Sequence, residues 1–251
     1  GVRYDEGRPV NPATPPQASP ALVRPTPASE FGTATVSRPG LRARTFRATR
    51  TRRLMPEFFT APRVSVLARP SFAEPAHLPV HWLGDSTDGE RLAEFAGRLC
   101  YMSQKNPANR NTRDYLENIK KQGHGSVLEH ANYSLLLEGV SRSLTHELVR
   151  HRAGFAYSQL SQRYVDESDA CFVVPPAIAG DELLAGAWRS QIESAQSAYV
   201  ALVGQLMERY GWVADKIHRR KMAREAARGV LPNSTETKIV VTANARAWRT
   251  M

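Results

Sequence analysis

The sequence has few of the features that mark disulfide-rich, metal-stabilised or membrane-spanning proteins. Its 251 residues include only two cysteines, Cys100 and Cys171, and these do not form a CxxC pair. A disulfide scaffold or a structural zinc site is therefore not expected, and a reducing cytoplasm is the predicted location. Because no run of 18 or more apolar residues occurs, no segment is predicted to span a membrane.

Three familiar signatures of catalysis or phosphate binding are also absent. The chain contains no GxGxxG turn, no Walker loop and no GxSxG elbow, so a dinucleotide is not expected to use a Rossmann turn. The string that starts at His146 superficially resembles the HExxH motif of zinc proteases. It places Arg150 where the second histidine must lie, and His151 comes one residue too late. No metal site is therefore predicted.

The positive charge is concentrated at one end of the chain. Residues 1–54 contain ten Arg, no Lys and three acidic residues, so they carry +7 of the formal charge of +10, and residues 55–251 carry +3. The same segment holds eight of the 17 Pro and little apolar periodicity, which predicts a disordered Arg/Pro-rich tail. Nucleic-acid binding would depend on this tail rather than on the folded part, so nucleic acid is not the favoured partner.

The sequence leaves the status of residues 1–54 open. They are translated sequence upstream of a misassigned start, a flexible arm with a role of its own, or a transit peptide, which an acid-poor segment rich in Arg and Ser would suit. The chain starts with Gly1, and a better-patterned segment, Phe58–Val66, follows Met55. We therefore expect the folded domain to cover residues 55–251.

The spacing of apolar residues predicts helices and strands that are interspersed along residues 55–251. In the second predicted helix, Thr112 is the expected N-cap and Gly123 is the residue that ends the helix. The mixture predicts an α+β fold: a single domain with a central, mostly antiparallel sheet flanked by helices, including one long helix pair. The expected helices are Gly89–Ser103, Thr112–Gln122, Ser141–His151, Asp181–Arg209, Asp215–Gly229 and Asn244–Trp248, and the expected strands are Ala131–Leu137, Cys171–Val174 and Lys238–Thr242.

Arginines and aromatic residues are gathered in one short stretch of the chain. Arg150-His151-Arg152 is followed shortly afterwards by Ser161-Gln162-Arg163-Tyr164, with Phe155, Tyr157 and Leu160 between them. An arginine is charged at any physiological pH, and its planar donor fork fits phosphate and carboxylate groups. Together with the flat rings, the arginines predict a pocket for an anion that also carries ring systems.

Three further residues could carry chemistry, although each could also be structural. His124 lies in the turn Gly123–His130, which could equally be a helix C-cap with solvent-exposed side chains. Within that turn, Glu129 precedes an apolar strand, so it could be a buried hydrogen-bond acceptor. Asn244 is a suitable N-cap, and a helix N-terminus is also a place for an anion or a ring rich in carbonyl groups.

Two arginines, Arg224 and Arg228, lie four residues apart and share a helix face. An anion bound between them is one interpretation, and a solvated basic face that continues residues 218–221 is the other. For Arg219 and Lys221 the solvated face is favoured, because charged side chains are mostly exposed. For Arg228 the sequence does not decide between the two.

These blocks, taken in their order along the chain, resemble the flavin-dependent thymidylate synthases, a family distinguished by an Arg-His-Arg…Ser motif. The resemblance covers about residues 63–251, and the joint order of the blocks is far more specific than any one of them. The blocks are Ser103 after a helix, Gly123-His124…Glu129-His130, Arg150-His151-Arg152…Ser161-Gln162-Arg163-Tyr164, Arg228…Leu231-Pro232 and Asn244-Ala245-Arg246.

The resemblance implies a homotetramer that holds FAD between subunits and converts dUMP to dTMP, with methylenetetrahydrofolate as carbon donor and NADPH as reductant. It implies that His124 is important for activity and that Arg228 polarises the pyrimidine as negative charge develops. It implies no metal and no enzyme nucleophile, in line with the absence of any signal for an activated cysteine. By position it implies FAD contacts at Ser103, Ser126, Glu129, Arg150, His151, Arg152, Asn244 and Arg246, and a dUMP site at Glu147, Gln159, Ser161, Gln162, Arg163 and Arg228.

Three departures from the family pattern bear on activity. The link between Arg152 and Ser161 has eight residues, Ala153–Leu160, where the family usually has seven. The sequence stops at Met251, where family members continue with a helix and a tail that include a further arginine, so we expect a C-terminally truncated domain. Residues 1–54 have no counterpart in the family. The alternative hypotheses are therefore a truncated, inactive family member and a basic nucleic-acid-binding protein.

Overall fold

The computed structural model describes residues 56–251, so the predicted tail over residues 1–54 lies outside the described residues. Every helix and strand predicted from apolar spacing is present, with its ends shifted by a few residues. In chain order the elements are β1 (Glu57–Phe59), β2 (Arg63–Ala68), α1 (Asp88–Cys100), α2 (Thr112–Lys121), the 3₁₀ helix η1 (Gly125–Glu129), β3 (Asn132–Ser141), α3 (Arg142–Leu148), β4 (Phe155–Gln159), β5 (Cys171–Val173), α4 (Pro176–Ala179), α5 (Glu182–Arg209), α6 (Lys216–Ala227), the 3₁₀ helix η2 (Arg228–Val230), β6 (Glu236–Asn244) and α7 (Ala245–Thr250).

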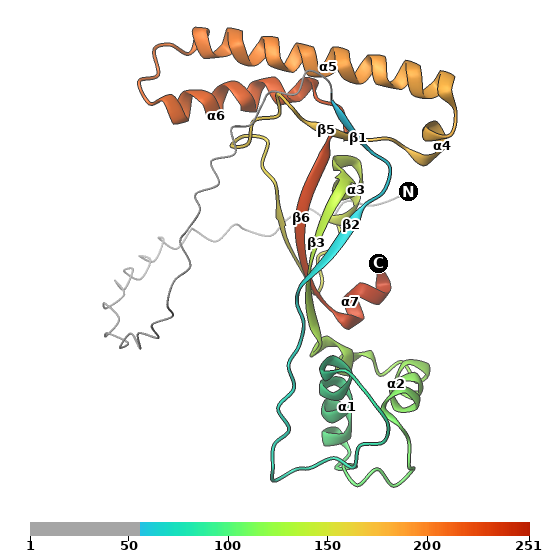
Figure 1. Ribbon diagram of the computed structural model, residues 1–251. Helices are drawn as coiled ribbons and strands as arrows, with labels where there is room; N and C mark the ends of the chain where they lie inside the picture. Colours follow the sequence, from blue (N-terminus) through green and yellow to red (C-terminus); the bar gives the residue numbers. More distant parts are fainter. Residues whose placement is uncertain (1–55) are drawn as a thin grey trace, which may run out of the picture. The chain divides into compact units, whose positions relative to one another are not determined.

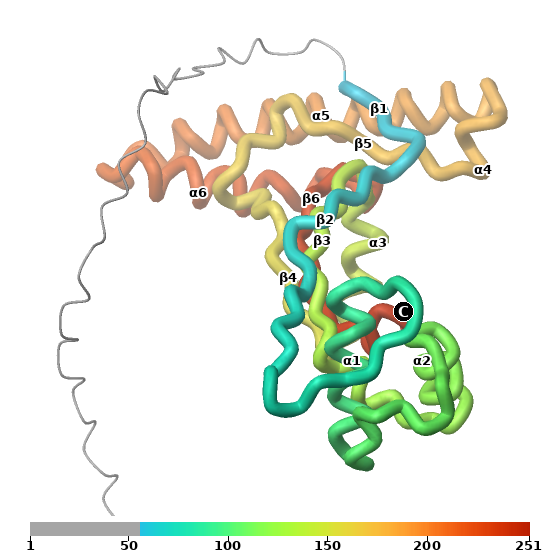
Figure 2. Tube along the Cα trace, turned by 60° about the horizontal axis from the view of Figure 1, so that its bottom comes forward, coloured from blue at the N-terminus to red at the C-terminus, as the bar shows by residue number. Residues whose placement is uncertain are grey.

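A four-stranded antiparallel sheet in the order β2-β3-β6-β4 forms the centre of the fold and confirms the predicted α+β class. β6 lies between β3 and β4, so both of its edges are paired (Figures 1 and 2). The register of β3 against β6 shifts between Leu137 and Val140, where Gly139 has a φ of +65°. Glycine takes this left-handed conformation without strain, which allows the bulge. β1 and β5 form a separate, parallel pair.

Helices lie beyond both ends of the sheet. α5 and α6 form a helix pair beyond one end, which confirms the predicted long pair, whereas α1 and α2 lie beyond the other end (Figures 1 and 2). Asp181 starts α5 by accepting hydrogen bonds from Leu183 N and Leu184 N at 2.9 and 3.0 Å. Within residues 56–251, even this 28-residue helix lacks the apolar character that a membrane-spanning helix needs.

One face of the sheet packs against α3 and α7. Ile239 and Val241 of β6 are fully buried and form a core with Leu148 of α3, and Trp248 of α7 packs against it. Successive strand residues point to opposite faces, so alternate residues of β4 face the same core. Phe155 and Tyr157 are such residues, and their rings stack with centroids 5.7 Å apart. The sheet register is therefore set by packing as well as by backbone hydrogen bonds.

The structure contains one strand that was not predicted from the sequence, and one predicted helix cap is wrong. Residues 153–160 are not only a link between motifs, because Phe155–Gln159 pair with β6 as strand β4. The N-cap of α2 is Asn111 rather than Thr112: Asn111 Oδ1 accepts a hydrogen bond from Asp114 N at 2.8 Å. Asn is the better of the two cap residues, and Thr112 is instead buried in the first turn.

A buried ion pair within α1 supports the contact of α1 with α2; we call these two helices the α1–α2 lobe. Glu94 is 1% exposed and Arg98, one turn later in α1, is 3% exposed. Arg98 Nε donates to Glu94 Oε1 at 2.7 Å, and the Arg98 guanidinium lies 4.5 Å from the centroid of the Tyr115 ring in α2. Tyr115 approaches α1 closely, since a Cβ at Gly97 would lie 2.4 Å from its hydroxyl oxygen. The contact between the Arg98 guanidinium and the Tyr115 ring therefore joins the two helices, while Glu94 supplies the counter-charge within α1.

Removing the buried carboxylate should destabilise the protein strongly. In Glu94→Gln, Arg98 stays buried without its counter-charge, and breaking such a pair costs about 3–5 kcal/mol. The midpoint of urea unfolding, followed by circular dichroism, should fall accordingly. The matched control is Glu117→Gln, which removes an exposed pair with Lys120 on α2 and should leave the midpoint unchanged. An equal fall of the unfolding midpoint in Glu94→Gln and Glu117→Gln would contradict the conclusion that the buried Glu94–Arg98 pair stabilises the protein.

Candidate functional site

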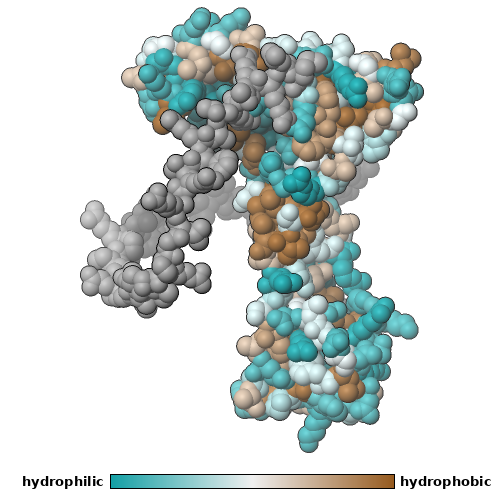
Figure 3. Space-filling model, viewed as in Figure 1, coloured by the Kyte–Doolittle hydropathy of each residue, from teal (hydrophilic) through white to brown (hydrophobic). Residues whose placement is uncertain are grey.

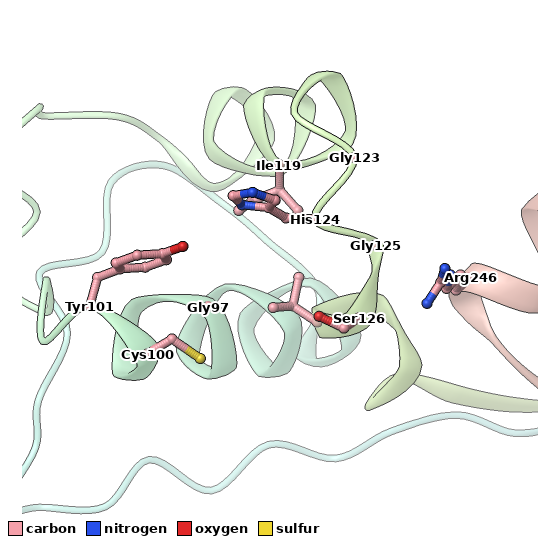
Figure 4. A pocket seen from close by; sticks show the side chains of 10 residues that line it. Gly97, Cys100, Tyr101, Ile119, Gly123, His124, Gly125, Ser126 and Arg246 are labelled. Atoms are coloured by element: carbon pink, nitrogen blue, oxygen red, sulfur yellow. The ribbon is translucent and has the colours of Figure 1, made fainter.

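A pocket of about 340 Å³ lies where the ends of α1 and α2 meet η1 and the first turn of α7. We call it the α1–α2 pocket. Figure 4 shows Tyr101 and His124 pointing toward each other across it, with Ser126 and Arg246 on the far side. Three residues predicted for cofactor binding or chemistry, His124, Ser126 and Arg246, therefore lie around one cavity.

His124 reaches this pocket because of the way α2 ends. Gly123 has a φ of +72°, its N–H donates to Lys120 O at 3.2 Å, and His124 N donates to Ile119 O at 3.0 Å. These two hydrogen bonds form a Schellman motif, with glycine at the left-handed position and His124 directly after it. The predicted end of the helix at Gly123 is confirmed. Helix capping and a role in the pocket are thus compatible, because the cap is what positions the imidazole.

Ser103 occupies the equivalent position at the end of α1. Met102 N donates to Leu99 O at 3.2 Å, and Ser103 N donates to Arg98 O at 2.9 Å. Met102 has a φ of +47°, a strained conformation for a residue with a side chain. The buried Arg98 donates from Nη1 to Ser103 O at 3.1 Å, so the ion pair of the lobe also holds this turn. Ser103 itself does not line the α1–α2 pocket, whereas the preceding Tyr101 does.

The start of α7 forms the opposite wall of the pocket. Asn244 Oδ1 accepts from Ala247 N at 2.8 Å, which confirms the N-cap interpretation of Asn244. Arg246 Nη1 lies 2.5 Å from Glu129 Oε1 of η1. Glu129 is not the buried acceptor that its place before a strand allowed, because its side chain is 48% exposed. The strand begins only at Asn132, so Glu129 still belongs to the surface 3₁₀ helix.

Arg150-His151-Arg152 forms an exposed turn between α3 and β4. Tyr157 of β4 fastens this turn, since its hydroxyl lies 2.9 Å from Leu148 O and 2.7 Å from His151 O. Burial raises the pKa of Tyr157, although Arg152 lowers it, so the hydroxyl remains a donor at neutral pH. Within the turn, Arg150 pairs with Glu147 at 3.4 Å, but both side chains are more than two-thirds exposed.

The link after the Arg-His-Arg motif starts with a tight turn. Phe155 N donates to Arg152 O at 3.2 Å, and Gly154, the third residue of the turn, has a φ of +78°. A Cβ at Gly154 would lie 2.8 Å from Asn244 Nδ2 and 3.1 Å from Ala247 Cβ. Glycine is therefore required for the close approach to α7. The approach brings the Arg-His-Arg turn beside Asn244, another predicted cofactor contact.

The second group of predicted residues lies at the other end of β4. Gln159 Nε2 donates to Thr145 Oγ1 at 3.0 Å and to Thr237 Oγ1 at 3.3 Å. Gln162 is 5% exposed, and its Nε2 has no hydrogen-bond partner among the described residues. Arg163 Nε lies 3.0 Å from Glu225 Oε2 of α6. A buried donor without a partner is costly, so Gln162 is well suited to a ligand that accepts a hydrogen bond.

Two arginines that are far apart in sequence join this second group. Burial lowers the pKa of Arg142; Glu167 raises this pKa and Arg228 lowers it. A guanidinium stays charged nonetheless, and a bound anion would offset both the burial and the repulsion. Arg142 was not among the residues predicted from the sequence, because it reads as an ordinary residue in the first turn of a helix. Only the fold brings it near Arg228.

Apart from Glu147, the predicted residues fall into two groups at opposite ends of β4, and the α1–α2 pocket is lined by none of the second group. Glu147 was predicted for the dUMP site, but the structure places it beside Arg150 of the first group. Tyr101 was missed, although an exposed aromatic residue directly after a helix is a signal that could have indicated it. Within residues 56–251, no group of three or more His, Cys, Asp or Glu side chains is placed to hold a metal ion.

The sequence matches a family model and is similar to proteins of known function. A family model described as thymidylate synthase complementing protein matches residues 82–251. The flavin-dependent thymidylate synthase of Mycobacterium sp. (strain JLS) is 49% identical over 199 residues, with 76% of each chain covered. That of Mycobacterium tuberculosis (strain ATCC 25177 / H37Ra) is 48% identical over 193 residues, again with 76% of each covered.

Solved structures share the fold. The UMP/dUMP methylase PolB from Streptomyces cacaoi, in its crystal structure with 5-Br UMP, has a TM-score of 0.55 at 20% identity and covers 77% of this chain and 76% of that chain. The structure of the same methylase with 5-Br dUMP has a TM-score of 0.51 at 21% identity and covers 76% of each chain. At this level of identity, the likeness establishes a common fold.

Glycine should stabilise the left-handed position at both helix ends that precede Ser103 and His124. Removing the glycine at the end of α2 should therefore lower the free energy of unfolding, and introducing one at the end of α1 should raise it. Gly123→Ala should destabilise the protein by about 1 kcal/mol, because only the left-handed backbone opposes it: no atom lies within 4 Å of the new Cβ. Met102→Gly should stabilise the protein by roughly 0.5–1 kcal/mol, because it relieves the strain at that residue. Urea unfolding midpoints measure both changes. Met102→Ala keeps the strained backbone and should give no gain; a gain as large as that of glycine would refute the role of strain.

Proposed function

The chain belongs to the flavin-dependent thymidylate synthase family, and on this premise we propose that it methylates dUMP to dTMP with bound FAD. Methylenetetrahydrofolate is the proposed carbon donor and NADPH the proposed reductant. The observation that carries the proposal is the arrangement of side chains at the two ends of β4. Arg150-His151-Arg152 precedes the strand and Ser161-Gln162-Arg163 follows it closely. The first group would bind FAD and the second dUMP.

The side chains of the first group suit the chemistry of FAD. FAD carries a pyrophosphate and two flat ring systems, so it needs cationic forks and flat or apolar surfaces. Arg150, Arg152 and Arg246 supply guanidinium groups, and Tyr101 and His124 supply rings at the α1–α2 pocket. When bound, the flavin supplies the hydride chemistry. The other proposed contacts are polar groups around this region: Ser103, Ser126, Glu129, His151 and Asn244.

A second copy of the chain would complete the cofactor site. At about 340 Å³, the α1–α2 pocket lies near the lower limit of the roughly 300–1,000 Å³ of small-ligand sites, so it suits part of a dinucleotide. Val64 and Val66 of the edge strand β2 are 58% and 63% exposed, and Figure 3 shows apolar surface over the sheet. Exposed apolar side chains on an edge strand are typical of a surface that another chain covers. We therefore infer a homotetramer with sites between subunits.

The second group would hold dUMP by its phosphate and its pyrimidine. Arg142 and Arg163 offer donor forks of the kind that bind a phosphate monoester. The buried amide of Gln162 offers a hydrogen bond that no described protein group accepts. Arg228, beside Arg142, would stabilise negative charge as it develops on the pyrimidine. Glu147, Gln159 and Ser161 are the other proposed contacts. Two cysteines without a CxxC pair favour the cytoplasm as the location of this reaction.

Product analysis tests this proposal. The purified full chain, supplied with dUMP, methylenetetrahydrofolate, NADPH and FAD, should form dTMP that is detected by chromatography. Leaving out any one of the four should abolish the product, and FMN should not replace FAD, because it lacks the adenylate half. Failure to bind FAD and dUMP would contradict the proposal. Binding of both without formation of dTMP would instead support the alternative of an inactive family member.

A further inference from the structure

A second cavity, which we call the α6 pocket, lies between α6 and the segment after β4. Its volume is about 240 Å³, and its lining is Arg163, Tyr164, Ile217, Arg220, Lys221 and Arg224. The four residues of α6 follow the spacing i, i+3, i+4, i+7, so they share one face of the helix. A face with this spacing usually packs into a core. Here it carries three cations, and its apolar member, Ile217, is 66% exposed.

Two cations of the α6 pocket have acidic partners and two do not. Arg163 pairs with Glu225 at 3.0 Å, and Arg224 pairs with Asp166 at 3.0 Å. Among residues 56–251, no ion pair is formed by Arg220 or Lys221. The neighbouring Arg219 differs, because it donates to the carbonyl groups of Gly211 and Val213 and so fastens the connection between α5 and α6. The α6 pocket therefore holds two positive charges in excess.

Arg224 has one hydrogen-bond donor without a partner. Its Nη1 donates to Tyr164 O at 2.7 Å and its Nη2 to Asp166 Oδ2 at 3.0 Å. Its Nε is buried and has no hydrogen-bond partner in the described part of the chain. A solvated basic face would not bury a charged donor in this way, because burial without a partner carries a desolvation cost. An anion in the pocket would offset that cost.

The α6 pocket also offers a flat surface. The Tyr164 ring is 60% exposed, and Lys221 Nζ lies 5.1 Å from the ring centroid. With the exposed Ile217, this ring could pack against an aromatic base while the cations bind a phosphate. The combination suits a phosphorylated nucleotide better than inorganic phosphate, which has no ring to pack.

We propose that the α6 pocket binds a purine nucleotide through a phosphomonoester, and that its ligand is the 2′-phosphoadenosine part of NADPH. The identity of the ligand rests on the proposed function, which requires a reductant that carries this group. Arg220, Lys221 and Arg224 would bind the 2′-phosphate, which is the group that distinguishes NADPH from NADH. The adenine would lie on Tyr164 and Ile217.

Equilibrium titration with adenosine 2′,5′-bisphosphate tests the proposal without any turnover. The full chain should bind this probe more tightly than 5′-AMP. Arg220→Gln and Lys221→Gln should each weaken binding of the bisphosphate by about tenfold, the loss expected when a charge-assisted hydrogen bond is removed. Binding of 5′-AMP should be unchanged. In turnover, both variants should raise the KM for NADPH and leave the KM for NADH and the kcat unaltered.

Two controls separate this proposal from its alternatives. Lys216→Gln removes the same charge from the same helix at a residue that does not line the pocket, so it should bind the bisphosphate like the parent protein. Unaltered circular dichroism shows that each variant is folded. Excess dUMP should not displace the bisphosphate, because the two ligands are assigned to different sites even though Arg163 lies near both.

Three results would overturn the proposal: variants that bind the bisphosphate as tightly as the parent, an equal loss in Lys216→Gln, or displacement by dUMP, which would make the pocket part of the dUMP site. Flavin uptake and dUMP binding, measured on the same preparation, keep this proposal apart from the proposed function. A protein that takes up FAD and dUMP but does not discriminate the bisphosphate from 5′-AMP would refute the α6 pocket alone.

Discussion

The register of β6 against its neighbours is the constraint on which the rest of the structure depends. β4 pairs with β6 from Phe155 opposite Ala243 to Gln159 opposite Ile239, while β3 pairs along the other edge. A slip of one residue would turn the stacked rings of β4 away from the core, so packing and hydrogen bonding enforce the same register. The five residues of β4 span about 17 Å, and they separate the Arg-His-Arg turn from the Ser161–Arg163 segment by a fixed distance.

Helix termini beside the sheet then position the side chains of the candidate site. At the ends of α1 and α2, the same pair of hydrogen bonds places Ser103 and His124 directly after a left-handed residue. At the junction from β6 to α7, the cap residue Asn244 lies against the turn at Gly154. The same cap fixes the start of α7 and thereby places Arg246 where it pairs with Glu129. Local capping, which a sequence reveals, thus sets the direction of side chains that serve the site.

Much of the fold follows from apolar spacing, because that spacing reports local burial on a helix or a strand. β4 was not predicted, because it has only five residues and the alternation of Phe155, Tyr157 and Gln159 with Ala156 and Ser158 is too short to stand out. Arg142 could not be found from sequence, because its proximity to Arg228 arises only when β3 pairs with β6. The membership of each side-chain group is a geometric result, whereas the role of each residue toward FAD or dUMP stays a prediction.

Separate titrations of FAD and dUMP on two arginine variants test the central claim that one strand joins two different ligand sites. Arg152→Gln should weaken FAD binding by about tenfold and leave dUMP binding unchanged, and Arg142→Gln should do the reverse, because each removes one charge-assisted contact from one site. Flavin fluorescence reports the first affinity and calorimetry the second. If each variant weakened both ligands to the same extent, or neither, the assignment of the two groups to two ligands would be contradicted.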